Sequence, residues 1–160
     1  MSLLVTFGAI RLIDLADLTR DKELEMMCPN NRAGTADLLI VSHHGHNMSN
    51  SPVLVHALHP RAAILTNGAK NGGEAEAWQT VRKSPGIEDI WQMHYTVDVG
   101  DANNAPEKFI ANPQKGPDPQ CFGTVLGDQP KWMKVSAQSD GAFTVTNSRS
   151  GQGKTYHRRG

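Results

Sequence analysis

Apolar residues recur along the chain in two patterns, one typical of β-strands and one typical of helices. Two apolar runs, Leu3 to Phe7 and Ile10 to Leu15, flank Gly8-Ala9 and predict a β-hairpin with a tight turn. Further strands are predicted at 36–41, 62–66 and 90–97. The first two of these are continuously apolar, which is typical of strands buried on both faces of a sheet.

Helices are predicted between these strands, at 21–27, 52–58 and 74–83. The second helix has Ser51 as a capping residue and Pro52 at its first helical position. In the third helix, Trp78 and Val81 lie on one side, so this helix is expected to cover one face of the sheet. The order of strand, helix and strand predicts an α/β fold.

The pattern changes over residues 98–130, where Asn, Gly, Pro and Asp dominate. This composition predicts a long surface excursion from one domain. Two strands that alternate in period two, 132–137 and 142–147, then flank Asp140-Gly141 and predict a closing hairpin, with a last short strand around Thr155-Tyr156. We find no internal repeat, so residues 1–160 are interpreted as a single domain.

Composition narrows the classes of function. Sixteen Lys and Arg balance sixteen Asp and Glu, so no net charge attracts nucleic acid or an anionic membrane. No stretch approaches the roughly 18 apolar residues of a membrane-spanning helix, so no membrane segment is expected. Cys28 and Cys121 lie far apart without a Cys-x-x-Cys motif, and they can either pair or stay free.

The densest ligand chemistry lies directly after the strand at 36–41, in Ser42-His43-His44-Gly45-His46. Binding sites of α/β sheets form at such strand ends. Adjacent residues of an extended chain point to opposite sides, so His43 and His44 share a site only if the strand breaks there, and Gly45 is expected to supply the break. We predict that one histidine binds a metal and the other contacts the substrate or a carboxylate; the alternative is a histidine-rich surface loop.

A divalent metal also needs an anionic ligand, and the candidates at a neighbouring strand end are Asp14 and Asp17. Asp17 lies past the end of its strand and is the better ligand. Asp14 lies inside the apolar run and is expected to hydrogen-bond to the backbone. The alternative for Asp17 is the N-cap of the helix at 21–27.

These residues carry a resemblance to a known family. The segments Asp14 to Thr19 and Asp37 to Gly45 resemble the second half of a metallo-β-lactamase-fold hydrolase, and the closest branch is the ComEC-like one. Its pattern is Gly-Asp-Leu on one strand and Asp-x-Leu-x-x-x-His-His-Gly on the next. Here Ala16 replaces the glycine. The resemblance implies an α/β fold of the αββα sandwich type, of which this chain holds the second half with a closing β-hairpin.

The resemblance also implies the roles of individual residues. Asp17 is expected to bridge two zinc ions, and His44 to complete the second zinc site. His43 lies beside the substrate, so His43 and His44 are the expected catalytic pair; which histidine binds the metal stays open. Ser49 and Asn50 stand where the family has small polar residues after the histidines, and they are expected to contact the substrate at the rim of the pocket.

One part of the family pattern is absent from these residues. The first half of such hydrolases carries a His-x-His-x-Asp-His cluster, and this chain has none. A catalytic zinc site ordinarily uses three protein ligands and an open position. The resemblance therefore implies the C-terminal part of a larger zinc-dependent hydrolase, completed by an N-terminal half or an oligomer partner.

Such an enzyme would cleave a phosphodiester or another ester by metal-bound hydroxide. A small molecule or a phosphodiester is the expected substrate, and nucleic acid follows by analogy alone. The alternative is a non-catalytic binding or structural module that retains the scaffold without a full metal site. In either case Asp17 and His44 are expected to approach one another. The strand residues Leu39, Val41, Ile64 and Leu65 are expected to be buried.

Overall fold

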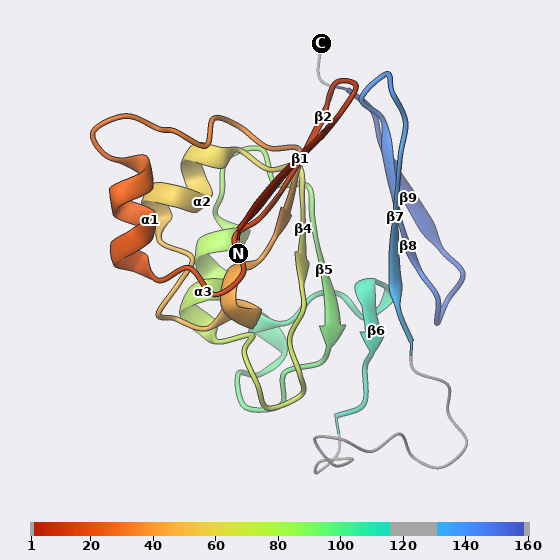
Figure 1. Cartoon of the computed structure of the whole chain (residues 1–160). Helices are drawn as coiled ribbons and strands as arrows, with labels where there is room; N and C mark the ends of the chain where they lie inside the picture. The colour runs from red at the N-terminus through yellow and green to blue at the C-terminus, as the bar shows by residue number, and fades with distance from the viewer. Residues whose placement is uncertain (1, 116–130, 159–160) are drawn as a thin grey trace.

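A six-stranded mixed sheet forms the centre of the protein (Figure 1). The computed structural model describes residues 2–115 and 131–158. The strands follow one another across the sheet in chain order; the first two are antiparallel and each later pair is parallel. They are β1 (Leu3–Phe7), β2 (Ile10–Asp14), β3 (Leu38–Ile40), β4 (Ala62–Leu65), β5 (Asp89–His94) and β6 (Ile110–Asn112).

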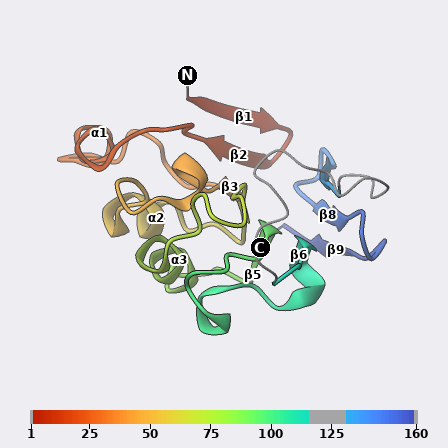
Figure 2. The same cartoon turned by 90° about the horizontal axis from the view of Figure 1, so that it is seen from below.

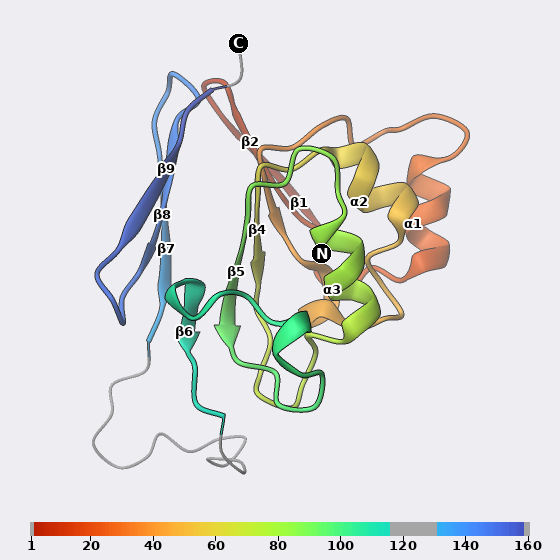
Figure 3. The same ribbon diagram turned by 180° about the vertical axis from the view of Figure 1, so that it is seen from behind.

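Three helices connect the parallel strands and cover one face of this sheet, as Figures 1 and 3 show from opposite sides. They are α1 (Arg20–Met27), α2 (Pro52–Leu58) and α3 (Ala75–Arg82). The predicted start of α2 is confirmed, because Ser51 Oγ accepts a hydrogen bond from the Leu54 backbone N–H at 3.3 Å and Pro52 follows it. Short 3₁₀ turns lie at Ser42–Gly45, Asp101–Asn103 and Glu107–Phe109.

A second, three-stranded antiparallel sheet covers the other face of the central sheet (Figure 1). Its strands are β7 (Met133–Ala137), β8 (Phe143–Asn147) and β9 (Gly153–Tyr156). The hairpin of β7 and β8 was predicted from its period-two pattern. The resulting layers, of helices, central sheet and second sheet, confirm the predicted mixed α/β architecture.

The inner strands β3 and β4 of the central sheet are buried on both faces, as their continuous apolar runs predicted. Alternate residues of β3 enter two different cores: Leu39 packs under the helices, and Leu38 packs under the second sheet. The burial predictions are confirmed, because the strand residues Leu39, Val41, Ile64 and Leu65 and the α3 residues Trp78 and Val81 are each at most 5% exposed.

The segment after β5 is partly ordered into the sheet, which the composition of residues 98–130 did not indicate. β6 pairs with β5 in parallel, with His94 opposite Asn112. The side chain of Asn104 holds the intervening loop, because its Oδ1 accepts hydrogen bonds from the Gln92 amide and from the Thr96 backbone N–H. Residues 116–130, including Cys121, lie outside the described part of the chain, and Cys28 is an exposed free thiol.

The described helices are all short. None of them has the length and apolar character to cross a membrane, in agreement with the sequence prediction.

Candidate functional site

The carboxyl ends of the parallel strands β2 to β5 meet at one edge of the central sheet, at the lower edge in Figure 1. The loop after β3, residues 42–47, contains the three neighbouring histidines, and we call it the histidine loop. Backbone hydrogen bonds join it to both neighbours. His43 N–H donates to Ala16 O at 2.8 Å, and Gly73 N–H donates to His44 O at 2.8 Å. The residues after β2, β3 and β4 therefore form one continuous surface.

The chain breaks out of the strand at the histidines themselves. His43 (φ 51°, ψ 46°) and His44 (φ 52°, ψ 16°) are both left-handed, and Gly45 follows with φ 80°. We expected Gly45 alone to make this turn. A left-handed conformation costs a non-glycine residue roughly 1–2 kcal/mol, so the surrounding contacts must hold both histidines in place.

Close packing against the loop before α3 supplies part of that constraint. A Cβ atom on Gly72 would lie 2.0 Å from His44 O, and one on Gly45 would lie 2.5 Å from Leu65 Cδ1. Glycine at these two positions lets the two loops approach at backbone distance. The Glu74 N–H then donates to Gly45 O at 2.9 Å.

Glu74 and Asn47 add a reciprocal pair of side-chain bonds. Glu74 Oε2 accepts the Asn47 backbone N–H at 2.8 Å, and Asn47 Oδ1 accepts the Ala77 backbone N–H at 3.0 Å in the first turn of α3. Each residue thus satisfies a backbone group of the other segment. The histidine loop and the start of α3 behave as one unit because of this pair.

His46 is fully engaged by two acceptors. Its Nδ1 lies 2.7 Å from Glu74 Oε1 and its Nε2 lies 3.0 Å from Asn71 Oδ1. These contacts raise the pKa of His46, with the Glu74 bond as the largest cause and the charge of Asp17 as a smaller one; burial opposes the shift. The same bond lowers the pKa of Glu74. When His46 is protonated, both ring nitrogens donate to these acceptors and neither has a lone pair to offer a metal.

His44 has the opposite arrangement. It is exposed, and its Nδ1 lies 3.0 Å from the carbonyl oxygen of Thr66, just after β4. A carbonyl only accepts hydrogen bonds, so Nδ1 carries the hydrogen, and in the neutral ring the lone pair is on Nε2. Metal-binding histidines are commonly held by a carbonyl or a carboxylate at the nitrogen that does not bind the metal, and the metal-ligand role of His44 stays a prediction.

His43 is half-buried between its neighbours. Its Nδ1 lies 3.4 Å from Ser49 Oγ, and its ring meets the ring of His46 edge-on with centroids 5.1 Å apart. Because the strand has already broken, His43 and His44 lie on the same loop at the same sheet edge. Their roles in catalysis and in substrate contact stay predictions.

Asp17 is exposed and follows β2, directly after the Ala16 carbonyl that receives the His43 N–H. Its charge acts on His46, so it lies on the same side of the site as the histidine loop. Within the described residues no hydrogen bond or ion pair joins Asp17 to His44. The alternative role of Asp17 as a helix cap is wrong, since Thr19 is the N-cap of α1.

Asp14 takes the backbone role that its position in the strand predicted. Its Oδ1 accepts the backbone N–H of Ala16 at 2.9 Å. This bond supports the left-handed turn at Ala16, where φ is 50°.

Ser49 and Asn50 lie beneath the histidine loop, and the expectation that they form a rim is wrong. Both are fully buried. The Asn50 side-chain amide makes two hydrogen bonds to the backbone of Ser42: Oδ1 accepts the Ser42 N–H at 3.0 Å, and Nδ2 donates to Ser42 O at 2.9 Å. Burial explains the difference: these polar groups are needed to satisfy the backbone at the point where β3 ends. Substrate contact by Ser49 and Asn50 stays a prediction.

Glu23 supports the histidine loop, a role that the sequence did not predict. This carboxylate in α1 is fully buried and accepts the backbone N–H groups of Asn50 and Ser51, both at 2.7 Å. It therefore fixes the segment that supports the histidine loop. Its local pattern resembles an ordinary surface acid in the first turn of a helix, so only the tertiary contact identifies it.

Asn67 joins the next two strand ends. Its amide donates to His94 O at 2.7 Å and to Thr96 Oγ1 at 2.9 Å. Burial lowers the pKa of His94, as expected for a strand histidine. The polar groups after β4 and β5 thus continue the surface on which the histidine loop lies.

A zinc site is not completed by these residues. In residues 2–115 and 131–158, no three His, Cys, Asp or Glu side chains are grouped to hold a metal ion. His44 fits as one ligand by orientation and Asp17 by chemistry, which is fewer than the three protein ligands of a typical catalytic zinc.

Comparisons with protein-family models, with curated proteins and with solved structures give no significant match.

Proposed function

We propose that this chain is the second half of a metal-dependent hydrolase of the metallo-β-lactamase superfamily, ComEC-like in its motifs. In this proposal Asp17 and His44 contribute to a two-zinc site, and an N-terminal half or an oligomer partner contributes the other ligands. The observation that carries the proposal is the hydrogen bond from His44 Nδ1 to Thr66 O, by which an exposed histidine just after a parallel strand keeps its Nε2 lone pair for a ligand.

The architecture supports the proposal at a coarser level. The protein has a helix layer, a central sheet and a second sheet. In this proposal they would be three of the four layers of an αββα sandwich, and the N-terminal half would supply the fourth. The candidate ligands follow β2 and β3, which are parallel neighbours, so both lie at the carboxyl edge where α/β sheets place their sites.

In this proposal each histidine of the loop has a different role. His44 presents Nε2 as a ligand. His43, which is half-buried beside Ser49, contacts the substrate in this proposal. His46, held by Glu74 and Asn71, fixes the loop and brings a positive charge to the site when it is protonated. Bound zinc would supply activation of water and polarisation of the scissile bond.

A phosphodiester or another ester is the substrate class of this proposal. The phosphodiester is favoured by the resemblance alone. Nucleic acid remains one member of this class by analogy.

Zinc titration of the full chain by calorimetry tests the ligand assignment. We expect weak binding that His44→Ala abolishes and that His157→Ala, a change at an exposed histidine near the C-terminal end of the second sheet, leaves unchanged. Equal zinc binding by wild type and His44→Ala would overturn the assignment of His44.

Hydrolysis of bis(p-nitrophenyl) phosphate with added zinc tests the activity. We expect little turnover from this chain alone and a large gain when a polypeptide that carries the His-x-His-x-Asp-His cluster is supplied. Absence of a gain, together with zinc binding that does not depend on Asp17 or His44, would favour a non-catalytic module on the same scaffold.

A further inference from the structure

β1 is an edge strand whose residues are those of an interior strand. All five residues, Leu3 to Phe7, are exposed, and the four apolar side chains among them are 46–53% exposed. The strand has no charge and no proline, and its pairing with β2 runs without a bulge from Leu3 to Phe7. Natural edge strands are ordinarily protected by one of these devices.

The other described sheet edges are protected. In the second sheet, β7 carries Lys134 and β9 carries Lys154. In the central sheet, the opposite edge strand β6 has only three residues. β1 is therefore the one described edge that is long, apolar and uncharged, and Figure 2 shows it at the outer border of the central sheet.

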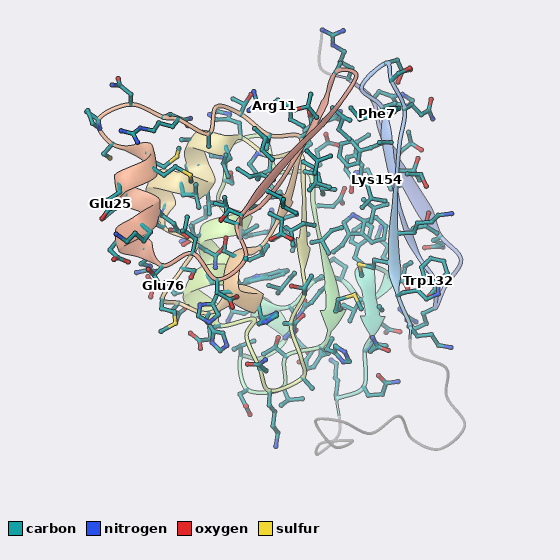
Figure 4. The ribbon with its side chains drawn as sticks, viewed as in Figure 1. Phe7, Arg11, Glu25, Glu76, Trp132 and Lys154 are labelled. Carbon is teal, nitrogen blue, oxygen red and sulfur yellow. The ribbon has the colours of Figure 1, made fainter. Side chains whose placement is uncertain are left out.

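Both ends of β1 are tied to the rest of the protein, so the strand is presented in a fixed conformation. Ser2 Oγ donates to Leu15 O at 3.1 Å at one end. At the other end, the Ala9 N–H donates to Ser139 O at 3.3 Å, so the turn beside Phe7 rests on the second sheet (Figure 4). A preorganised strand loses little conformational entropy on pairing.

The side chains of β1 divide between its two faces. Phe7 lies opposite Ile10 and Val5 opposite Leu12, which places Leu3, Val5 and Phe7 on the face toward the second sheet. Leu4 lies opposite Ile13, on the helix face. Apolar surface is thus exposed on both faces of one strand, as in strands with a neighbour on each side.

We propose that β1 pairs antiparallel with β1 of a second copy of this chain, about a two-fold axis at Val5. Such an isologous contact joins the two central sheets into one. On the face toward the second sheets, Val5 meets Val5 of the second copy and Leu3 meets Phe7. On the helix face, Leu4 meets Thr6. These β-branched and aromatic–aliphatic cross-strand pairs are favourable, and no like charges oppose one another.

The apolar surface that β1 exposes limits the area that a dimer can bury. Because side chains of this size have surfaces of roughly 150–200 Å², four half-exposed ones present on the order of 350 Å² per chain. Two copies together bury on the order of 700 Å² of side-chain surface, below the roughly 1,200–2,000 Å² of stable interfaces. We therefore expect a weak, reversible dimer with a Kd of roughly 10–1,000 μM.

Sedimentation equilibrium of the full chain, from about 10 μM to about 1 mM, measures the association in the expected range. We expect the average mass to rise from monomer toward dimer, and amide hydrogen exchange in β1 to slow over the same range. A monomer throughout, or exchange in β1 that does not depend on concentration, would overturn the proposal.

A charge swap at Val5 identifies the contact. Val5→Lys and Val5→Glu each place like charges opposite one another at the two-fold axis, so each variant alone should be monomeric, and their equimolar mixture should form a heterodimer. Ser136→Lys adds the same charge to the exposed edge strand β7 and should dimerise as wild type. Dimers that survive both single Val5 variants, with native circular dichroism, would contradict the proposed pairing.

Discussion

Glu74 and His46 come from different elements, 28 residues apart, and their side chains meet at 2.7 Å between Oε1 and Nδ1. Glu74 also binds the Asn47 backbone through its second oxygen. One carboxylate at the start of α3 thus bonds at two points to the loop that carries the three histidines.

Glu74→Ala is expected to lower the free energy of unfolding by about 1 kcal/mol, a value reduced from that of a buried charged hydrogen bond because both side chains are partly exposed. The ring proton signals of His43 and His44 should shift as their left-handed conformations are released. Urea unfolding and NMR measure the two effects. Glu25→Ala, which removes an exposed helix pair with Lys22, is the matched control and should leave the histidine signals unchanged.

The same pair makes stability depend on pH. The pKa of His46 is raised from 6.5, so its contribution is fully present below pH 6.5 and is lost as the pH rises through the raised value. The pKa of Glu74 is lowered from 4.5, so its contribution is present above pH 4.5 and is lost as the pH falls through the lowered value. The pair therefore stabilises the fold most between these two values.

We expect urea unfolding to show a larger difference between wild type and Glu74→Ala at pH 5.5 than at pH 8.5. Comparing the two proteins at each pH removes the contribution of His94, whose lowered pKa acts in the opposite direction. A difference that is equal at both pH values would show that His46 and Glu74 do not interact in solution.

Asn50 is expected to be the most sensitive polar residue under the site. Asn50→Ala removes the side-chain acceptor of the buried Ser42 N–H and one bond to the Ser42 carbonyl, and leaving a buried N–H unsatisfied costs about 1–3 kcal/mol. Asn50 also has φ 63°, so Asn50→Gly separates the lost amide from backbone strain. Urea unfolding should show a large loss in the free energy of unfolding for both variants, with the glycine variant the more stable. A loss under about 0.5 kcal/mol in both would show that the Asn50 amide does not stabilise the Ser42 backbone.

Leu39→Ala tests the central core. Leu39 is fully buried under the helices, and its truncation should cost about 2–5 kcal/mol in the free energy of unfolding. Leu24→Ala, on the exposed side of α1, should cost far less. Similar small losses at both positions would show that β3 is not packed on both faces.

Local patterns in the sequence were sufficient to predict most of the framework. Two neighbouring residues of β3, Leu38 and Leu39, are both apolar, and this alone indicates a strand buried on two faces. Ser51-Pro52 marks the start of α2 because a cap and a first-turn proline satisfy the helix terminus locally. The histidines after β3 could likewise be placed at a strand end.

Tertiary contacts determined the rest. β6 forms because Asn112 pairs beside His94, although its three residues have no strand pattern of their own. His43 and His44 are left-handed in a loop that backbone groups distant in the chain hold: Ala16 after β2 bonds to His43, and Gly73 after β4 bonds to His44. The periodicity of apolar residues indicates which face of a helix or strand is buried. The β6 pairing and the left-handed histidines depend instead on which distant backbone donors and acceptors must be satisfied when the elements meet. Only the folded structure could therefore decide them.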